Sequence, residues 1–170
     1  MITFLRALSI TVAGLASLLL LGGRAPAWDG VLVPGAVMTQ PFGCTAFELE
    51  PIDASCPQGH FHGGIDFAAP AGTQVHAPAP GVAHTGAGGP CGIHVVVEHD
   101  AGMLTLYCHL AAAFVADREP VTPGQVIGLV GSSGLSTGSH LHFEVHRFGL
   151  AVDPAPWLIS WQAGNNKGGT

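Results

Sequence analysis

From residue 66 onward, the chain alternates short apolar and polar runs with turns rich in Gly, Pro and Asp. Residues 93–99 are β-branched with a period of two. Residues 103–110 follow as the next strand, and Asp100-Ala101-Gly102 between them is typical of a hairpin. We predict further strands at 73–77, 82–85, 125–130 and 141–147. Beyond the first 27 residues no stretch has a sustained helical period, and residues 110–117 are expected to form a short turn or helix. The pattern therefore predicts a single small domain that is mainly β and is built of antiparallel sheets.

Composition narrows the class of protein. A length of 170 residues suits one domain, and 25 Gly and 13 Pro beside only 9% charged residues favour short strands and tight turns. The net charge is −6, and Lys167 is the only lysine. The chain therefore offers no basic stripe to nucleic acid, and its acidic balance argues against adhesion to an anionic membrane.

The first 27 residues differ from the rest. Arg6 is followed by an uncharged apolar stretch at residues 7–21 and by the small residues Ala25-Pro26-Ala27, which is the pattern of a cleaved signal peptide. A membrane anchor is the alternative, but the apolar run of about 15 residues is shorter than the ~20 that span a bilayer. We therefore expect export, cleavage before Trp28 and a mature domain at residues 28–170.

Four cysteines lie in the predicted mature part: Cys44, Cys56, Cys91 and Cys108. In an exported chain an even number indicates disulfides, and three pairings exist. We favour Cys44–Cys56, which closes a polar loop, and Cys91–Cys108, which would join neighbouring strands. A metal site built from thiolates is the weaker interpretation because no C-x-x-C pair occurs.

Strand alternation makes a further prediction for residues 103–110. Side chains of a strand point to alternate faces, so Tyr107 and His109 are expected to share one face while Cys108 takes the other. A bridge from Cys108 to Cys91 would then lie away from any site that His109 faces.

Ten histidines stand beside only five Lys and Arg residues, and two clusters carry the chemistry. In His62-Gly63-Gly64-Ile65-Asp66, two glycines give the backbone the freedom to bring an imidazole and a carboxylate to one point. In His140-Leu141-His142, the two imidazoles face the same side of a strand. Histidine and aspartate ligands with one open position are the pattern of a catalytic zinc site.

These clusters belong to three longer motifs. Residues 62–73 (HGGIDFAAPAGT) resemble the first signature of the lysostaphin-type, LytM-like peptidases, and residues 106–110 (LYCHL) resemble the second. Residues 136–145 (STGSHLHFEV), approached through 124–128 and 131–134, resemble the third. The likeness runs from about residue 34 to residue 157. Ser139 departs from the proline often found in the family, and two disulfides would be additional to the common pattern.

The resemblance implies a zinc site and two catalytic groups. His62, Asp66 and His142 match the family's ligands for one zinc ion per chain. His109 and His140 match its catalytic histidines, which orient or deprotonate water and stabilise the oxyanion. The implied fold is a small β domain with a groove across an antiparallel sheet.

The implied function is that of an exported zinc metalloendopeptidase that hydrolyses the stem peptides or cross-bridges of peptidoglycan. The expected location is periplasmic, cell-wall-associated or secreted. We expect a monomer whose partners are peptidoglycan peptides, with no membrane association after signal cleavage. Rival functions are a non-catalytic wall-binding or hydrolase-activating module and a secreted metal-storage protein. The presence of all five matching site residues favours the peptidase.

Two residues beside the motifs have open roles. Glu144 shares a strand face with His140 and His142, so it is either a hydrogen-bond acceptor behind a metal-site histidine or an ordinary solvated carboxylate. Tyr107 either contacts the substrate or packs in the core.

Overall fold

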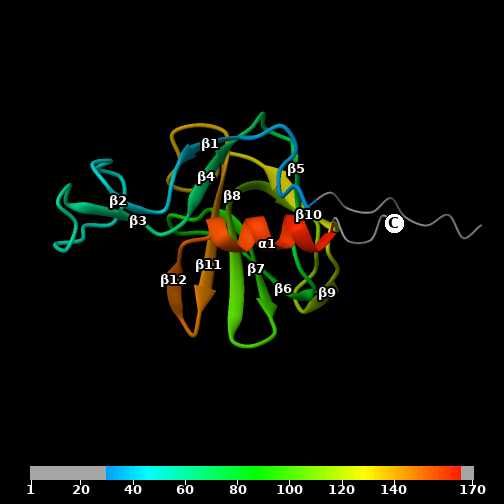
Figure 1. Ribbon diagram of the computed structural model, residues 1–170. Coiled ribbons are helices and arrows are strands. Elements are labelled where there is room, and N and C mark those ends of the chain that lie inside the picture. Colours follow the sequence, from blue (N-terminus) through cyan, green and yellow to red (C-terminus); the bar gives the residue numbers. More distant parts are fainter. Residues whose placement is uncertain (1–29, 166–170) are drawn as a thin grey trace, which may run out of the picture.

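The computed structural model describes residues 30–165, and Figure 1 shows their arrangement. The predicted signal segment at residues 1–27 lies outside the described residues, as does the segment 166–170. Within the described part, no helix combines the length and the apolar character that crossing a membrane requires.

Strands are the main regular secondary structure of the described chain, and every pairing between them is antiparallel. The elements are β1 (Val37–Gln40), β2 (Gly43–Thr45), β3 (His60–His62), β4 (Ile65–Ala68), β5 (Gln74–His76), β6 (Gly81–Gly86), β7 (Ile93–His99), β8 (Met103–Ala113), β9 (Glu119–Val121), β10 (Val126–Val130), β11 (His140–Arg147), β12 (Leu150–Val152) and α1 (Ala155–Asn165). The predicted fold class, a small and mainly β domain of antiparallel sheets, is therefore confirmed.

The long strand β8 lies at the centre of the main sheet. The strand order is β1-β4-β11-β8-β7-β6-β9, while β10 pairs with both β8 and β5, and β12 pairs with β11. Strands β2 and β3 form a separate two-stranded sheet, which projects from the side of the main sheet as an arm (Figure 1). We call residues 43–62 the β2–β3 arm.

The pattern of short segments between turns located the central strands well. β7 has the predicted bounds, and β10 and β11 each differ from the predicted range by one residue at one end. The turn or helix expected at 110–117 is wrong, because β8 continues to Ala113. The cause is a distant partner: Ala112 and Ala113 pair with Leu129 and Gly128 of β10, and no local pattern reveals such a pairing.

Helix α1 was not predicted. Its sequence, APWLISWQAGN, carries apolar residues around most of its circumference and no charge, so no helical period marks it. Asp153 caps the helix, because its Oδ1 accepts a hydrogen bond of 2.9 Å from the backbone N–H of Ala155. Trp157, Leu158 and Trp161 pack against the buried core. The helix thus covers the core face of the sheet and leaves the opposite face of β4, β11 and β8 for a site.

Candidate metal centre

Neighbouring strands place the candidate site residues opposite one another. In the register of β4 and β11, Asp66 lies opposite His142 and Ala68 lies opposite His140. His142 also lies opposite Cys108 on β8. Directly opposed residues of antiparallel strands share a face of the sheet, so Asp66, His142 and Cys108 form one row across three strands.

The glycine pair between β3 and β4 brings His62 to this row. His62 ends β3 and is fully buried. A Cβ atom added at Gly64 would overlap the backbone carbonyl oxygen of Phe143 on β11. Only glycine therefore allows the chain to enter β4 so close to β11, and this close approach turns His62 toward Asp66.

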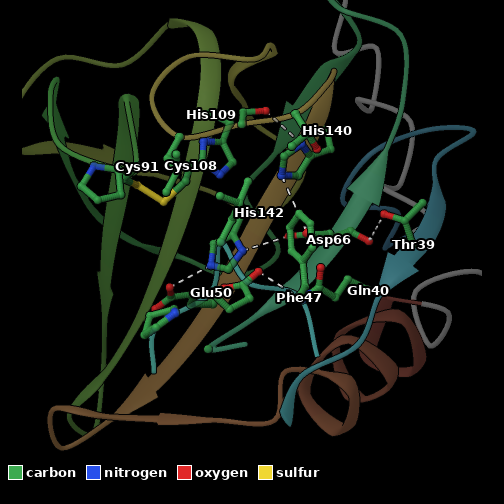
Figure 2. A pocket seen from close by; sticks show the side chains of 18 of the residues that line it. Thr39, Gln40, Phe47, Glu50, Asp66, Cys91, Cys108, His109, His140 and His142 are labelled. Atoms are coloured by element: carbon green, nitrogen blue, oxygen red, sulfur yellow. Dashed lines mark hydrogen bonds and ion pairs between the residues drawn. A yellow bond between two sulfur atoms is a disulfide. The ribbon is translucent and has the colours of Figure 1, made fainter. Parts of the chain in front are cut away.

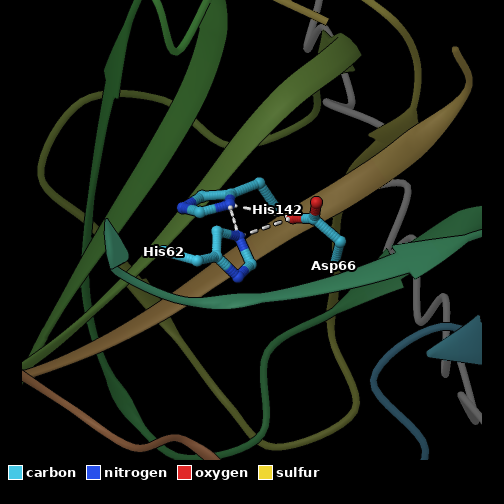
Figure 3. Close-up of side chains that lie close together, drawn as sticks. All are labelled: His62, Asp66 and His142. Carbon is cyan, nitrogen blue, oxygen red and sulfur yellow. Dashed lines mark hydrogen bonds and ion pairs between the residues drawn. The ribbon is translucent and has the colours of Figure 1, made fainter. Parts of the chain in front are cut away.

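Three donor atoms converge on one point, as Figure 3 shows. The Nε2 atom of His62 lies 3.2 Å from Oδ1 of Asp66 and 3.0 Å from Nδ1 of His142, which itself lies 2.9 Å from Oδ1 of Asp66. Two ligands of a tetrahedral zinc ion with bonds of ~2.0 Å are ~3.3 Å apart. The donor set therefore fits zinc after an opening of about half an ångström or less. Within residues 30–165, no other group of three metal-binding side chains comes together in this way.

Hydrogen bonds behind the cluster orient both imidazoles. Nδ1 of His62 donates to the carbonyl oxygen of Pro41 at 2.8 Å, and Nε2 of His142 donates to Oε1 of Glu144 at 2.8 Å. The other oxygen of Glu144 contacts His146. Each bond places the proton on the far ring nitrogen and leaves the lone pair of the near nitrogen directed at the cluster. Glu144 is thus a hydrogen-bond acceptor behind a histidine of the cluster, which is the first of the two roles that the sequence left open for it.

The carboxylates of Asp66 and Glu144 favour a positive charge at the cluster. Burial alone would raise the pKa of Asp66, but its hydrogen bonds with His142 and His62 hold that pKa well below its usual range. Burial would lower the pKa of His142, whereas its bonds to Asp66 and Glu144 raise it to about 9. Without a metal, His142 therefore carries a second proton on Nδ1, the atom that would bind a cation. Binding of a cation would release that proton.

Two further histidines lie beside the cluster. Nδ1 of His109 donates to the carbonyl oxygen of Ser133, and Nδ1 of His140 donates to that of Gly138, both at 2.8 Å. The ring centroids of His109 and His140 are 4.7 Å apart, and Nε2 of His140 lies 3.8 Å from Oδ2 of Asp66. Burial lowers the pKa of His109 despite the opposing effect of its bond to Ser133. His109 is therefore neutral at pH 7, with Nε2 free to accept a proton.

These groups line a groove with a volume of about 820 Å³. The β2–β3 arm forms part of its wall with the exposed apolar side chains of Phe47, Leu49 and Ile52. Residues 135–139 also line it, and no Lys or Arg is among the lining residues. Figure 2 shows His109, His140 and His142 together in this groove, with Asp66 below His140. The expected groove across the sheet is therefore present.

The strand alternation predicted for Tyr107 and His109 is wrong. Tyr107 is fully buried and packs against Phe143, with ring centroids 5.2 Å apart. His109 instead lines the groove together with Cys108, because an irregularity in the β7–β8 register adds one residue to β8 at this point. Tyr107 is consequently a core residue, and a direct substrate contact through its side chain is excluded.

Both favoured disulfides are present. Cys44–Cys56 closes the β2–β3 arm, and Cys91–Cys108 joins the turn before β7 to β8. Contrary to the expectation from alternation, the second bridge lies at the groove, since Cys91 and Cys108 are among its lining residues.

The sequence analysis missed two residues that shape the site. Oε1 of Glu50, on the β2–β3 arm, lies 3.9 Å from Nε2 of His62 and accepts a hydrogen bond of 3.1 Å from Gln40. Ser133 holds the His109 ring through its backbone carbonyl. Glu50 stands in a turn-rich segment with no periodicity, and a backbone carbonyl has no residue-type signal, so neither was visible in the motifs.

The chain belongs to peptidase family M23, whose model matches residues 60–154. This match confirms the resemblance to lysostaphin-type peptidases. Among solved structures, the catalytic domain of the antimicrobial peptidase lysostaphin from Staphylococcus simulans is 30% identical, with a TM-score of 0.60 over 73% of this chain and 92% of that one. The catalytic domain of a variant of the prophage-encoded M23 protein EnpA from Enterococcus faecalis is 31% identical, with a TM-score of 0.62 over 72% of this chain and 91% of that one.

Curated relatives are similar over the same region. The DD-carboxypeptidase/endopeptidase Mpg of Neisseria meningitidis is 43% identical over 118 residues, which are 69% of this chain and 26% of Mpg. The peptidoglycan DD-endopeptidase ShyA of Vibrio cholerae is 41% identical over 85 residues, 49% of this chain and 20% of ShyA. The murein hydrolase activator EnvC of Escherichia coli is 48% identical over 67 residues, 39% of this chain and 16% of EnvC. The chain thus spans about a quarter or less of the length of these relatives.

Proposed function

We propose that the protein is an exported zinc metalloendopeptidase that hydrolyses peptide bonds in the stem peptides or cross-bridges of peptidoglycan. The observation that carries the proposal is the convergence of His62 Nε2, Asp66 Oδ1 and His142 Nδ1 at a groove that His109 and His140 also line. These three side chains would hold one zinc ion, which supplies Lewis-acid activation of water and of the peptide carbonyl.

The protein's own histidines handle the proton and the developing charge. His109 and His140 each donate from Nδ1 to a backbone carbonyl, so their Nε2 atoms are the acceptors. In this role His109, neutral because burial lowers its pKa, takes a proton from the attacking water and can later return it to the leaving amine. His140, whose Nε2 faces Asp66, orients the water or donates to the oxyanion once protonated.

Three observations support peptidoglycan as the substrate and export as the route. ShyA is a peptidoglycan DD-endopeptidase, and Mpg is a DD-carboxypeptidase/endopeptidase. The groove is open and lined by apolar and acidic residues, which suits an extended peptide. The signal-like pattern of residues 1–27 and the two disulfides are consistent with an oxidising compartment outside the cytoplasm.

A second candidate is a non-catalytic activator of wall hydrolases, which the similarity to EnvC favours. Its action would need neither a metal nor the two groove histidines. The complete constellation of His62, Asp66, His142, His109 and His140 in one groove supports the enzyme over the activator.

The test is mass spectrometry of the soluble products that the mature, oxidised protein releases from purified sacculi of several wall types. A zinc chelator and the His140→Ala protein serve as controls. New peptide fragments that disappear in both controls are expected, and their masses identify the bond. Sacculi left intact by folded, zinc-loaded protein would contradict the proposal and favour the activator.

A further inference from the structure

The backbone of β8 is irregular at the residue that faces the groove. Ile93 of β7 pairs with Leu110, and Val95 pairs with Tyr107, so the two residues Cys108 and His109 stand opposite the single residue 94. This is a β-bulge. His109 has a φ of 62°, in the left-handed region that non-glycine residues rarely adopt. The bulge turns His109 to the groove, whereas a regular strand would turn it to the face of Tyr107.

A left-handed histidine within a strand requires restraints on both sides. On one side, Cys91 is attached to β8 twice: its sulfur is bonded to Cys108, and its carbonyl oxygen accepts the backbone N–H of His109 at 2.8 Å. The turn that carries Cys91 is itself held, since the carbonyl oxygen of Pro90 accepts the N–H of Leu135 at 2.7 Å.

Ser133 supplies the restraint on the other side. Its carbonyl oxygen accepts Nδ1–H of His109, its Oγ donates to the carbonyl oxygen of Leu110, and the same Oγ accepts the N–H of Ile93, each at 2.8 Å. A Cβ atom at Gly92 would overlap Ser133. The turn at 88–92 and the segment at 131–134 therefore pack against each other and enclose the bulge.

We propose that the Cys91–Cys108 disulfide is a positioning element for His109, holding the β-bulge that turns this histidine into the groove; this rests on the proposed function, which makes His109 a catalytic residue. Of the two bonds from Cys91 to β8, the disulfide is the covalent one. Without it, Cys91 keeps only its backbone hydrogen bond from His109, and β8 can relax toward regular alternation. His109 then leaves its place beside His140, while the cluster of His62, Asp66 and His142 keeps its own strands and register.

The second disulfide provides a matched control. Cys44–Cys56 closes a loop of similar length, with a sequence separation of 12 against 17, but it lies within the β2–β3 arm. The two double variants, Cys91→Ala/Cys108→Ala and Cys44→Ala/Cys56→Ala, are therefore compared in the parent protein and in a His109→Ala background, with a soluble cross-linked peptide obtained from sacculi as the substrate.

Loss of Cys91–Cys108 is expected to lower kcat by about tenfold or more, because small displacements of a catalytic group are costly. KM and the zinc dissociation constant should change by less than about twofold. In the His109→Ala background the same double variant should cause no additional loss of kcat. Any one of three results would overturn the proposal: a parent-like kcat, an equal loss of kcat in both backgrounds, or a loss of zinc.

A second measurement is independent of catalysis. In protein labelled with ¹⁵N-histidine, the NMR signal of the His109 Nδ1 proton, bonded to Ser133, should disappear or shift in Cys91→Ala/Cys108→Ala and remain in the control. Unchanged His109 signals would overturn the proposal. If the parent hydrolyses nothing but the signal responds as expected, the positioning role stands and the proposed function fails.

Folding is checked by backbone amide spectra outside residues 88–110. If Cys91→Ala/Cys108→Ala loses the native spectrum, Cys91→Ala/Cys108→Val replaces it, since valine refills the volume that the Cys108 sulfur occupied. Unfolding of both variants would overturn the proposal, because the disulfide would then stabilise the whole sheet and not specifically position His109.

Discussion

His142 on β11 lies directly opposite Asp66 on β4, and its Nδ1 atom is 2.9 Å from Oδ1 of that aspartate. The two residues are 76 positions apart in the sequence. The regular antiparallel register of β4 and β11 therefore creates the centre of the site, and the glycine pair before β4 then adds His62. The donor geometry depends on the pairing of two strands and on the close approach of a third segment.

Replacement of His142 should abolish metal binding. We expect His142→Ala to lose zinc and peptidase activity together, because only two ligands remain. Addition of zinc should raise the Tm of the parent by several degrees but leave that of the variant unchanged, since a ligand stabilises only the state that binds it. Differential scanning calorimetry with and without zinc measures this. His84→Ala, on the surface of β6, is the control and should respond as the parent does.

Replacement of His109 should separate binding from turnover. His109→Ala is expected to keep most of the zinc and to lose about 10²- to 10⁴-fold in kcat, the contribution typical of a general acid–base group. Zinc content by mass spectrometry of the native protein and rates of peptide release provide the two readouts. Full activity in this variant would refute a catalytic role for His109.

Glu144 should contribute to zinc affinity through His142. Its Oε1 accepts the Nε2 proton of His142 at 2.8 Å, which fixes the ring orientation and the tautomer. Loss of such a partner typically weakens metal binding by about 10- to 100-fold. Competition with a chromophoric chelator should show this loss for Glu144→Ala. Glu98→Ala, an exposed carboxylate on β7, should retain the affinity of the parent, and an equal loss in both would point to a general charge effect.

The neighbouring glycines at 63 and 64 should respond differently to alanine. A Cβ at Gly64 would overlap the carbonyl oxygen of Phe143, whereas the nearest atom to a Cβ at Gly63 is Oε1 of Glu144 at 3.6 Å. Gly64→Ala should therefore separate β4 from β11, lower the free energy of unfolding by about 1–3 kcal/mol and weaken zinc binding. Gly63→Ala should be tolerated. Urea denaturation of both variants tests the contrast, and similar behaviour would contradict it.

Acidification should destabilise the fold partly through His99. Burial lowers the pKa of His99 from 6.5, against the bond to the Pro80 carbonyl that raises it. The unfolded chain therefore binds more protons as the pH falls through about 6.5 and below, and stability is lost in that range. In the zinc-free protein, urea midpoints between pH 7.5 and 5 should decrease less for His99→Gln than for the parent.

The motifs were sufficient to predict which residues meet, but not how the backbone brings them together. The alternation of short segments with Gly- and Pro-rich turns predicted β7, β10 and β11, and the family resemblance of the motifs implied that His62, Asp66 and His142 form one metal site. The bulge at His109 was not predictable, because it depends on the register between β7 and β8 and on a turn held by Ser133, 24 residues away. Helix α1 was missed for a local reason. It is apolar on both its buried and its outer surface, so no alternation of apolar and polar residues marks it.

The left-handed backbone at His109 has an evolutionary consequence. A non-glycine residue in this conformation costs on the order of 1 kcal/mol, which Gly would not incur. Selection for thermostability alone would therefore favour a different residue at position 109, and in the proposed peptidase it is selection for turnover that would retain an imidazole there. A descendant of this chain that became a pure binding module would be free to replace it and would gain stability by doing so. In a lineage that lost catalysis, a substitution at position 109 would thus be expected before any change in the fold.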